Sequence, residues 1–189
     1  MARRKRTEKK RILICTEGTE TEPQYIESLI QALGTSGESV SVSTVGVGKD
    51  PLKIVEKCVH KLETAKNPFD MGVCLIDLDQ HATLNSAIKL AENHGIEIVV
   101  SNLKFEVWLL WHVSSRTAFF GSKQLDRMMT ENKILENGKH LSTKFPVENY
   151  PQACAVAYRA DPELKPGRRG PNSSTSMPWL IDLLTGKNA

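Results

Sequence analysis

Residues 71–79 of the chain read MGVCLIDLD, and this stretch decides the fold. The mostly apolar residues 71–76 run without a break into the acidic pair Asp77 and Asp79. An apolar run of this length is typical of a strand buried on both faces, as in a parallel sheet. Another run, ILIC at residues 12–15, leads through Thr16 to Glu17 in the same way. Both runs predict strands of an open α/β sheet, with acids at the carboxyl edge where such sheets bind ligands.

The acids at this edge predict a metal site. Glu17, Asp77 and Asp79 would repel one another there unless a divalent cation neutralised them, and carboxylate oxygens suit Mg²⁺ or Mn²⁺. Successive side chains of a strand point to opposite faces, so a metal shared by Asp77 and Asp79 requires the strand to end at about Asp77. The structural alternative for each acid is a helix cap or a solvated loop.

The rest of the chain continues the alternation of strands and helices. Glu22 and Pro23 open an expected helix that Gly34 ends, and further breakers separate the later elements. The order β-α-β-α-β-α-β predicts a mainly parallel sheet of about four strands flanked by helices. We expect a basic arm at 1–11, an α/β core at 12–115 and a mainly helical extension packed on it at 116–189. Helices are expected near 83–94, 105–113, 122–130, 150–160 and 175–184.

The charge of the chain is unevenly distributed. Residues 1–11 hold seven of the 25 Lys and Arg residues but only one of the 22 acids. Such an arm commonly contacts nucleic acid, because each neutralised phosphate releases condensed counterions, although it could also be a solvated tail. Another basic group lies at 165–170. The candidate nucleic-acid contacts are Arg3, Arg4, Lys5, Arg6, Lys144, Lys165, Arg168 and Arg169.

Composition excludes several classes of protein. A length of 189 residues, 40% of them hydrophobic and 25% charged, fits one well-buried globular domain. No apolar stretch approaches the roughly 20 residues that cross a bilayer. The four cysteines are far apart without a CxxC pair, which indicates reduced structural thiols. We therefore expect a cytoplasmic protein with no membrane partner.

Four segments together resemble a known family. They are ILICTEGTETEP at 12–23, LIDLD at 75–79, SNLKFEVWLL at 101–110 and, more weakly, NSSTS at 172–176. LIDLD resembles the Toprim DxD motif, and SNLKFEVWLL is similar to the SNPxFExWLL segment of RloB-like proteins. In this order the segments resemble the RloB-like family, which is similar to the wider Toprim superfamily of topoisomerases, primases and nucleases.

The resemblance implies that Glu17, Asp77 and Asp79 organise magnesium on adjacent strands for phosphodiester chemistry, with Glu17 as a ligand or a general base. A metal ion there could polarise the scissile phosphate and lower the pKa of a bound water. RloB-like proteins are often linked to restriction or anti-phage loci and to an ATPase partner. The resemblance thus implies a Mg²⁺- or Mn²⁺-dependent nuclease acting on RNA or DNA in bacterial defence by abortive infection. An ATPase and another copy of the chain are its candidate protein partners.

Glu106 is a further candidate catalytic residue. It lies within an aromatic segment, where a charged group is costly unless it is paired or placed at a metal. It could be a fourth ligand, orient Asn102, or pair with Lys104 or Arg116.

Three other residues near these segments have ordinary structural explanations. Trp108 and Trp111 are expected in the core rather than as platforms for base stacking. Glu22 could point from the start of its helix toward the same edge as the other acids, but the helix dipole already favours an acid in the first turn.

Two other functions fit the sequence less directly. The chain could be a nucleic-acid-binding or assembly subunit of a defence complex with a non-catalytic Toprim-like site. It could instead pass strands or polymerise nucleotides. Strand passage needs a nucleophilic tyrosine, and Tyr25, Tyr150 and Tyr158 lack a persuasive context. Polymerisation needs a nucleotide-binding module, and GVGK at 46–49 lacks the P-loop spacing.

Overall fold

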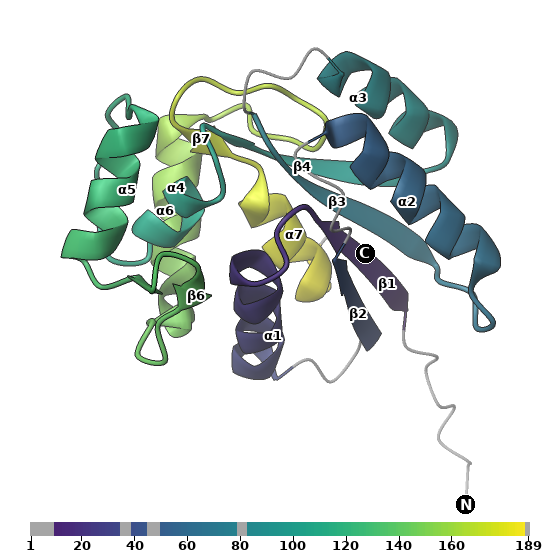
Figure 1. Ribbon diagram of the computed structural model, residues 1–189, viewed down its shortest axis with the longest axis horizontal. Helices are drawn as coiled ribbons and strands as arrows, with labels where there is room; N and C mark the ends of the chain where they lie inside the picture. Colours follow the sequence, from purple (N-terminus) through teal and green to yellow (C-terminus); the bar gives the residue numbers. More distant parts are fainter. Residues whose placement is uncertain (1–9, 35–38, 45–49, 79–82, 188–189) are drawn as a thin grey trace, which may run out of the picture.

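A computed structural model describes residues 10–34, 39–44, 50–78 and 83–187 (Figure 1). Within them, strands and helices alternate along the first half of the chain as predicted. The strands are β1 (Arg11–Thr16), β2 (Ser39–Thr44), β3 (Met71–Asp77), β4 (Ile96–Asn102), β5 (Leu135–Glu136), β6 (His140–Leu141) and β7 (Ser174–Thr175). The helices are α1 (Thr21–Leu33), α2 (Pro51–Thr64), α3 (Leu84–Asn93), α4 (Glu106–Leu110), α5 (Ser122–Glu131), η1 (Val147–Asn149, 3-10), α6 (Tyr150–Ala160) and α7 (Met177–Leu184).

The main sheet has the strand order β2-β1-β3-β4-β7. The first four strands pair in parallel, and only the short β7 is antiparallel to its neighbour β4. The predicted mainly parallel sheet flanked by helices is therefore confirmed. The expected last helix begins at Met177, because Ser174 and Thr175 pair with β4 instead.

The sheet is covered on both faces, which explains why its central strands β1 and β3 are mostly apolar. Ile12 and Ile14 belong to a core formed with α1 and the C-terminal helices, whereas Leu13 and Cys15 belong to another core under α2 and α3. Figure 1 shows α2 and α3 on one side of the sheet and α1 and α7 on the other. This alternation is what a strand buried on both faces requires.

The segment after β4 differs in detail from the expectation. The predicted helix at 105–113 is shorter, and the chain leaves it in a turn after Leu110. Trp108 and Trp111 are fully buried, which confirms their place in the core. The β5–β6 hairpin was not predicted; Asn137 and Gly138 form its turn with positive φ angles of 52° and 74°.

Two general expectations can be compared with the described residues. All four cysteines are free thiols, and Cys15, Cys58 and Cys74 are buried. Across the same ranges, no helix has both the length and the apolar character that a membrane crossing needs.

Candidate active site

β1 and β3 lie side by side and end at the same edge of the sheet. They pair in parallel, with Thr16 opposite Leu75. Glu17 directly follows β1, and Asp77 is the last residue of β3. The adjacency that the family resemblance implies for these two acids is therefore present.

Asp77 is held by a backbone group from the segment that follows β4. Its Oδ1 atom accepts a hydrogen bond of 2.9 Å from the N–H of Phe105. Burial raises the pKa of Asp77 well above its ordinary range. Three nearby acids raise it further, in the order Glu106, Glu22 and Glu17, while the hydrogen bond from Phe105 opposes the change. The charged form of Asp77 is thus unfavourable without a compensating cation.

Four acids therefore gather at the carboxyl edge of the sheet. They come from the β1–α1 connection, the first turn of α1, the end of β3 and the first turn of α4. Each is half-buried. These edge carboxylates are Glu17, Glu22, Asp77 and Glu106.

Glu22 belongs to this set, although the helix dipole alone would explain an acid at its position. Its Oε1 atom accepts a hydrogen bond of 3.2 Å from the N–H of Gly18. Burial raises the pKa of Glu22; hydrogen bonds from its own amide and that of Gly18 oppose this, and Glu106 and Glu17 add to it. A methyl group on Gly18 would lie 2.2 Å from Oε2 of Glu22, so any larger residue at position 18 would displace this carboxylate. The sequence allowed this placement, because the helix after β1 starts at this edge, but it did not distinguish it from an acid favoured by the helix dipole alone.

Glu106 lies near other acids rather than beside the basic partners considered for it. The ammonium group of Lys104 pairs with Asp126, so the structure does not show the alternative in which Lys104 is the partner of Glu106. Arg116 makes no ion pair within the part of the chain that the structure describes. A role for Glu106 at the site stays a prediction, supported by its effect on the pKa of Asp77.

The donor chemistry of the edge carboxylates suits a hard divalent cation such as Mg²⁺ or Mn²⁺. As they stand, no three His, Cys, Asp or Glu side chains among the described residues are grouped so that they could hold one metal ion. Asp79, which was predicted to complete the ligand set, lies outside the described ranges. The metal site therefore stays a prediction.

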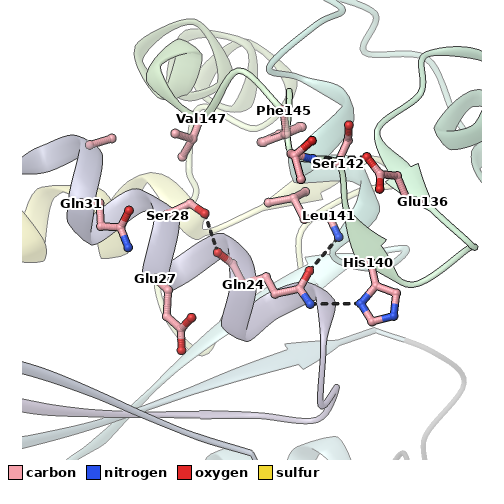
Figure 2. Close-up of a pocket in the computed structure, with 12 residues that line it drawn as sticks. Gln24, Glu27, Ser28, Gln31, Glu136, His140, Leu141, Ser142, Phe145 and Val147 are labelled. Carbon is pink, nitrogen blue, oxygen red and sulfur yellow. Dashed lines mark hydrogen bonds between the residues drawn. The ribbon is translucent and has the colours of Figure 1, made fainter.

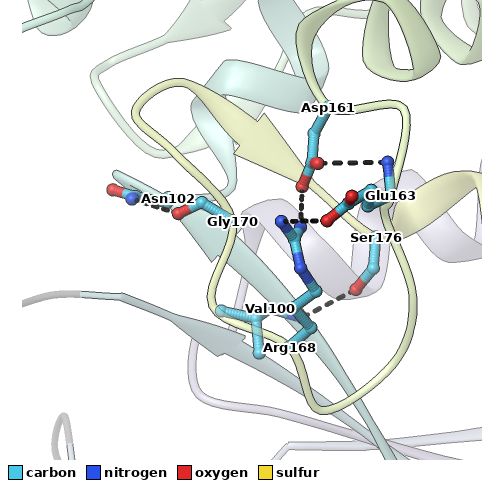
Figure 3. A network of polar contacts seen from close by, with 7 residues as sticks. All are labelled: Val100, Asn102, Asp161, Glu163, Arg168, Gly170 and Ser176. Carbon is cyan, nitrogen blue, oxygen red and sulfur yellow. Dashed lines mark hydrogen bonds and ion pairs between the residues drawn. The ribbon is translucent and has the colours of Figure 1, made fainter.

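The predicted nucleic-acid contacts differ in their surroundings. Lys144, Lys165 and Arg169 are exposed. Arg168 pairs with Asp161 and, at 3.3 Å, with Glu163, and Figure 3 shows its guanidinium group pointing toward both acids. A phosphate at Arg168 would have to compete with these internal partners. Outside the described residues lie Arg3, Arg4, Lys5 and Arg6.

The loop that carries Arg168 is fastened beside the carboxyl edge (Figure 3). The Nδ2 atom of Asn102, at the end of β4, donates a hydrogen bond of 2.9 Å to the carbonyl oxygen of Gly170. The N–H of Val100 donates one of 3.0 Å to Oγ of Ser176. These contacts fix the loop against β4 on either side of β7.

A groove of about 760 Å³ lies between α1 and the β5–β6 hairpin (Figure 2). Gln24 joins the two, because its Oε1 atom accepts a hydrogen bond of 2.8 Å from the N–H of Leu141 and its Nε2 atom lies 3.2 Å from Nδ1 of His140. No sequence pattern predicted this groove, since it depends on a hairpin that was not foreseen. It lies further along the helix that carries Glu22.

Comparison with known proteins gives one match. A family model described as RloB-like protein matches residues 12–184, from β1 to the last residue of α7. No curated protein and no solved structure matches the chain. The matched range includes all the edge carboxylates and nearly the whole chain. The protein therefore belongs to the RloB-like family.

Proposed function

We propose that this protein is a Mg²⁺- or Mn²⁺-dependent phosphodiesterase of the Toprim type that cuts RNA or DNA. The observation that supports this most is the gathering of the edge carboxylates, where burial and neighbouring acids raise the pKa of Asp77. Like charges at a half-buried site cost free energy without a counter-charge, and such perturbed groups are concentrated at functional sites.

The proposed chemistry assigns different tasks to these acids. Glu17 and Asp77, together with Asp79, would hold the metal, which when bound supplies Lewis-acid activation of the phosphate and of a water. Glu22 is suited to exchange a proton with the attacking or leaving oxygen, because its raised pKa lies closer to neutral pH than that of an ordinary carboxyl group. Phe105 orients Asp77 through its backbone N–H.

The family assignment supports the biological setting. Because RloB-like proteins are often linked to restriction or anti-phage loci and to an ATPase, we propose a cytoplasmic effector of bacterial defence by abortive infection. An ATPase partner would provide the control that a toxic nuclease needs.

A nucleic-acid-binding or assembly subunit with a non-catalytic site is the alternative candidate. It is favoured by the lack of a ready metal-binding group among the described side chains. Strand passage has less support. Tyr25 is fully buried, and its hydroxyl lies 3.2 Å from Nε2 of His112, so this tyrosine is not placed to attack a substrate.

The test is a cleavage assay with wild type, Asp77→Asn and the matched control Glu92→Gln, which changes an exposed acid on α3. Each protein is incubated with tRNA, mRNA, single-stranded DNA and plasmid, in Mg²⁺, Mn²⁺ or EDTA. We expect metal-dependent cleavage by wild type and Glu92→Gln that Asp77→Asn lacks. Cleavage by none of them, with salt-sensitive binding by all three, would replace the nuclease proposal with the binding-subunit alternative.

A further inference from the structure

Two acid-free stretches of the chain lie side by side in the fold. Residues 107–125 and 164–181 contain no Asp or Glu. Asn172 joins them, because its Nδ2 atom donates a hydrogen bond of 2.9 Å to the carbonyl oxygen of Phe120 and its Oδ1 atom accepts one of 3.3 Å from the Phe120 N–H. The hydroxyl of Ser173 donates another, of 3.3 Å, to the carbonyl oxygen of Ala118. The exposed side chains of these two segments therefore include basic residues and no acid. Among the basic residues of the two segments, Arg168 is paired with Asp161 and Glu163 from the preceding segment.

This surface lies beside the edge carboxylates. Asn172 and Ser173 directly precede β7, which pairs with Ser101 and Asn102, the last two residues of β4. Three residues after Asn102 comes Phe105, whose N–H binds Asp77. The hydrogen bonds between Asn172 and Phe120 thus place residues 118–120 at the same edge of the sheet as the proposed active site.

Phe119 is held in solvent on this surface. Its side chain is 73% exposed, the largest exposure among the large hydrophobic residues that the structure describes. The backbone before Phe119 is tethered, because Nε1 of Trp111 donates a hydrogen bond of 3.0 Å to the carbonyl oxygen of Arg116 and Nη2 of Arg159 donates one of 2.7 Å to that of Ser115. After Phe119, the backbone of Phe120 is held by Asn172. Its exposure is therefore a property of an anchored loop.

Three exposed cations accompany this ring. Arg116 and Lys123 lie three and four residues from Phe119, and Arg169 lies three residues before Asn172. Within the described ranges none of the three forms an ion pair, and the guanidinium of Arg116 lies 5.9 Å from the centroid of the neighbouring Phe120 ring. A single exposed apolar side chain needs no explanation, but an anchored aromatic ring among uncompensated cations matches the make-up of single-strand binding surfaces.

We propose that Phe119, with Arg116, Lys123 and Arg169, is a stacking platform for an unpaired base of single-stranded nucleic acid. The cations would attract the phosphates while the ring stacks on a base, which a duplex keeps inside its own stack. The inference rests on the proposed function for its substrate class and adds the strandedness of that substrate.

The test measures binding in EDTA, so that it does not depend on metal-dependent cleavage. The probes are a labelled, unstructured oligonucleotide of about 15 residues, as RNA and as DNA, and the matching duplexes. Fluorescence anisotropy is followed for wild type, Phe119→Ala, Phe119→Trp and Tyr158→Ala. Tyr158 is the control because it is an aromatic residue, 42% exposed, on α6.

We expect Phe119→Ala to weaken single-strand binding about 5- to 100-fold, with Phe119→Trp and Tyr158→Ala close to wild type. Arg116→Gln should lower the slope of log K against log salt by about 0.7, the value for one lost phosphate contact on a single strand. The added tryptophan of Phe119→Trp should lose fluorescence when the oligonucleotide binds.

Three results would overturn the platform: no single-strand binding by wild type, equal affinity for Phe119→Ala, or unchanged fluorescence of Phe119→Trp at saturation. A failure of the nuclease proposal alone would give a different result. The variants would still differ in single-strand binding, but no protein would cleave any substrate in the cleavage assay.

Discussion

The N–H of Phe105 donates a 2.9 Å hydrogen bond to Oδ1 of Asp77. This contact links the end of β3 to the start of α4. The Phe105 ring is buried, and its centroid lies 5.5 Å from that of Tyr25 in an edge-to-face arrangement. The aromatic core that holds Phe105 therefore helps to position the Asp77 carboxylate. A substitution in this core could disturb the site even though it changes none of the edge carboxylates.

The first prediction concerns the pH dependence of stability. The raised pKa of Asp77 means that, between the ordinary carboxyl value of about 3.9 and the raised value, the folded state binds more protons than the unfolded state. Its contribution to stability is therefore lost as pH rises through this range. Asp77→Asn should remove this loss and increase the free energy of unfolding at neutral pH in EDTA.

Urea unfolding of wild type and Asp77→Asn at a series of pH values checks this prediction. Adding Mg²⁺ at neutral pH should stabilise wild type and not the variant, because only wild type keeps the carboxylate. A difference between the two proteins that stays constant with pH would contradict the placement of Asp77 among acids.

The next prediction concerns Gly18. In Gly18→Ala the new methyl group must displace the carboxylate of Glu22, which lies 2.2 Å from the position of that methyl. We expect cleavage to fall about 10- to 100-fold, the usual cost of disturbing a group that supports an active site. Gly121→Ala is the matched control, because open space surrounds its added methyl. Equal losses of cleavage rate in both variants would show that Glu22 has no part in the reaction.

The fold could be predicted from sequence where burial dictates residue type. Runs such as residues 12–15 are apolar throughout because both faces of β1 are covered. The β5–β6 hairpin was missed, since its two-residue strands are too short to show alternation, although Asn137 and Gly138 are a known turn signal. β7 was missed because it is polar. The buried Oγ1 of Thr175 is satisfied by a 2.8 Å hydrogen bond with Oγ of Ser101 and by one of 3.3 Å from the N–H of Met177.

The candidate site was foreseen in part for a similar reason. Glu17 and Asp77 follow apolar runs, so their place at the carboxyl edge can be read along the chain. Glu22 could not be assigned in this way, because an acid in the first turn of a helix has a local explanation as well. The ion pairs of Arg168 with Asp161 and Glu163 depend on the path of the loop between them, and local sequence patterns do not predict that path.

The third prediction separates a structural from a binding role for Arg168. Its side chain is 28% exposed, and its partner Asp161 is 6% exposed, so Arg168→Leu would leave a buried charge without its partner. We expect a loss of about 3 kcal/mol in the free energy of unfolding. The control Arg127→Leu breaks an exposed pair with Glu131 and should cost no more than about 0.5 kcal/mol.

Chemical denaturation of both variants, alongside oligonucleotide binding, distinguishes the two roles. Unchanged stability of Arg168→Leu with weakened binding would assign the arginine to phosphate contact instead.

The fourth prediction concerns the buried His112. Burial lowers its pKa to about 4, although the hydrogen bond to the carbonyl oxygen of Trp108 opposes this. From the ordinary value of 6.5 down to about 4, the unfolded state therefore binds more protons than the folded state. The stability present above pH 6.5 should fall by about 3 kcal/mol as pH drops through this window.

Unfolding of wild type and His112→Gln between these pH values measures the effect, with the exposed His94→Gln as control. His112→Gln should lack this acid-dependent loss, whereas His94→Gln should keep it. Parallel curves for wild type and His112→Gln would show that the imidazole is not held neutral in the fold.

The pairing of β7 with β4 has a consequence for how the protein is made. Ser101 and Thr175 lie 74 positions apart, yet their hydroxyls meet at the edge of the sheet. During synthesis from the N-terminus, the edge of β4 that pairs with β7 stays unpaired until residue 175 has been added. Unpaired strand edges can pair with other chains and cause aggregation. Asn172, which fastens Phe120, arrives equally late. A translation product arrested before these residues therefore has the edge carboxylates but lacks β7 and the contact of Asn172 with Phe120 beside them.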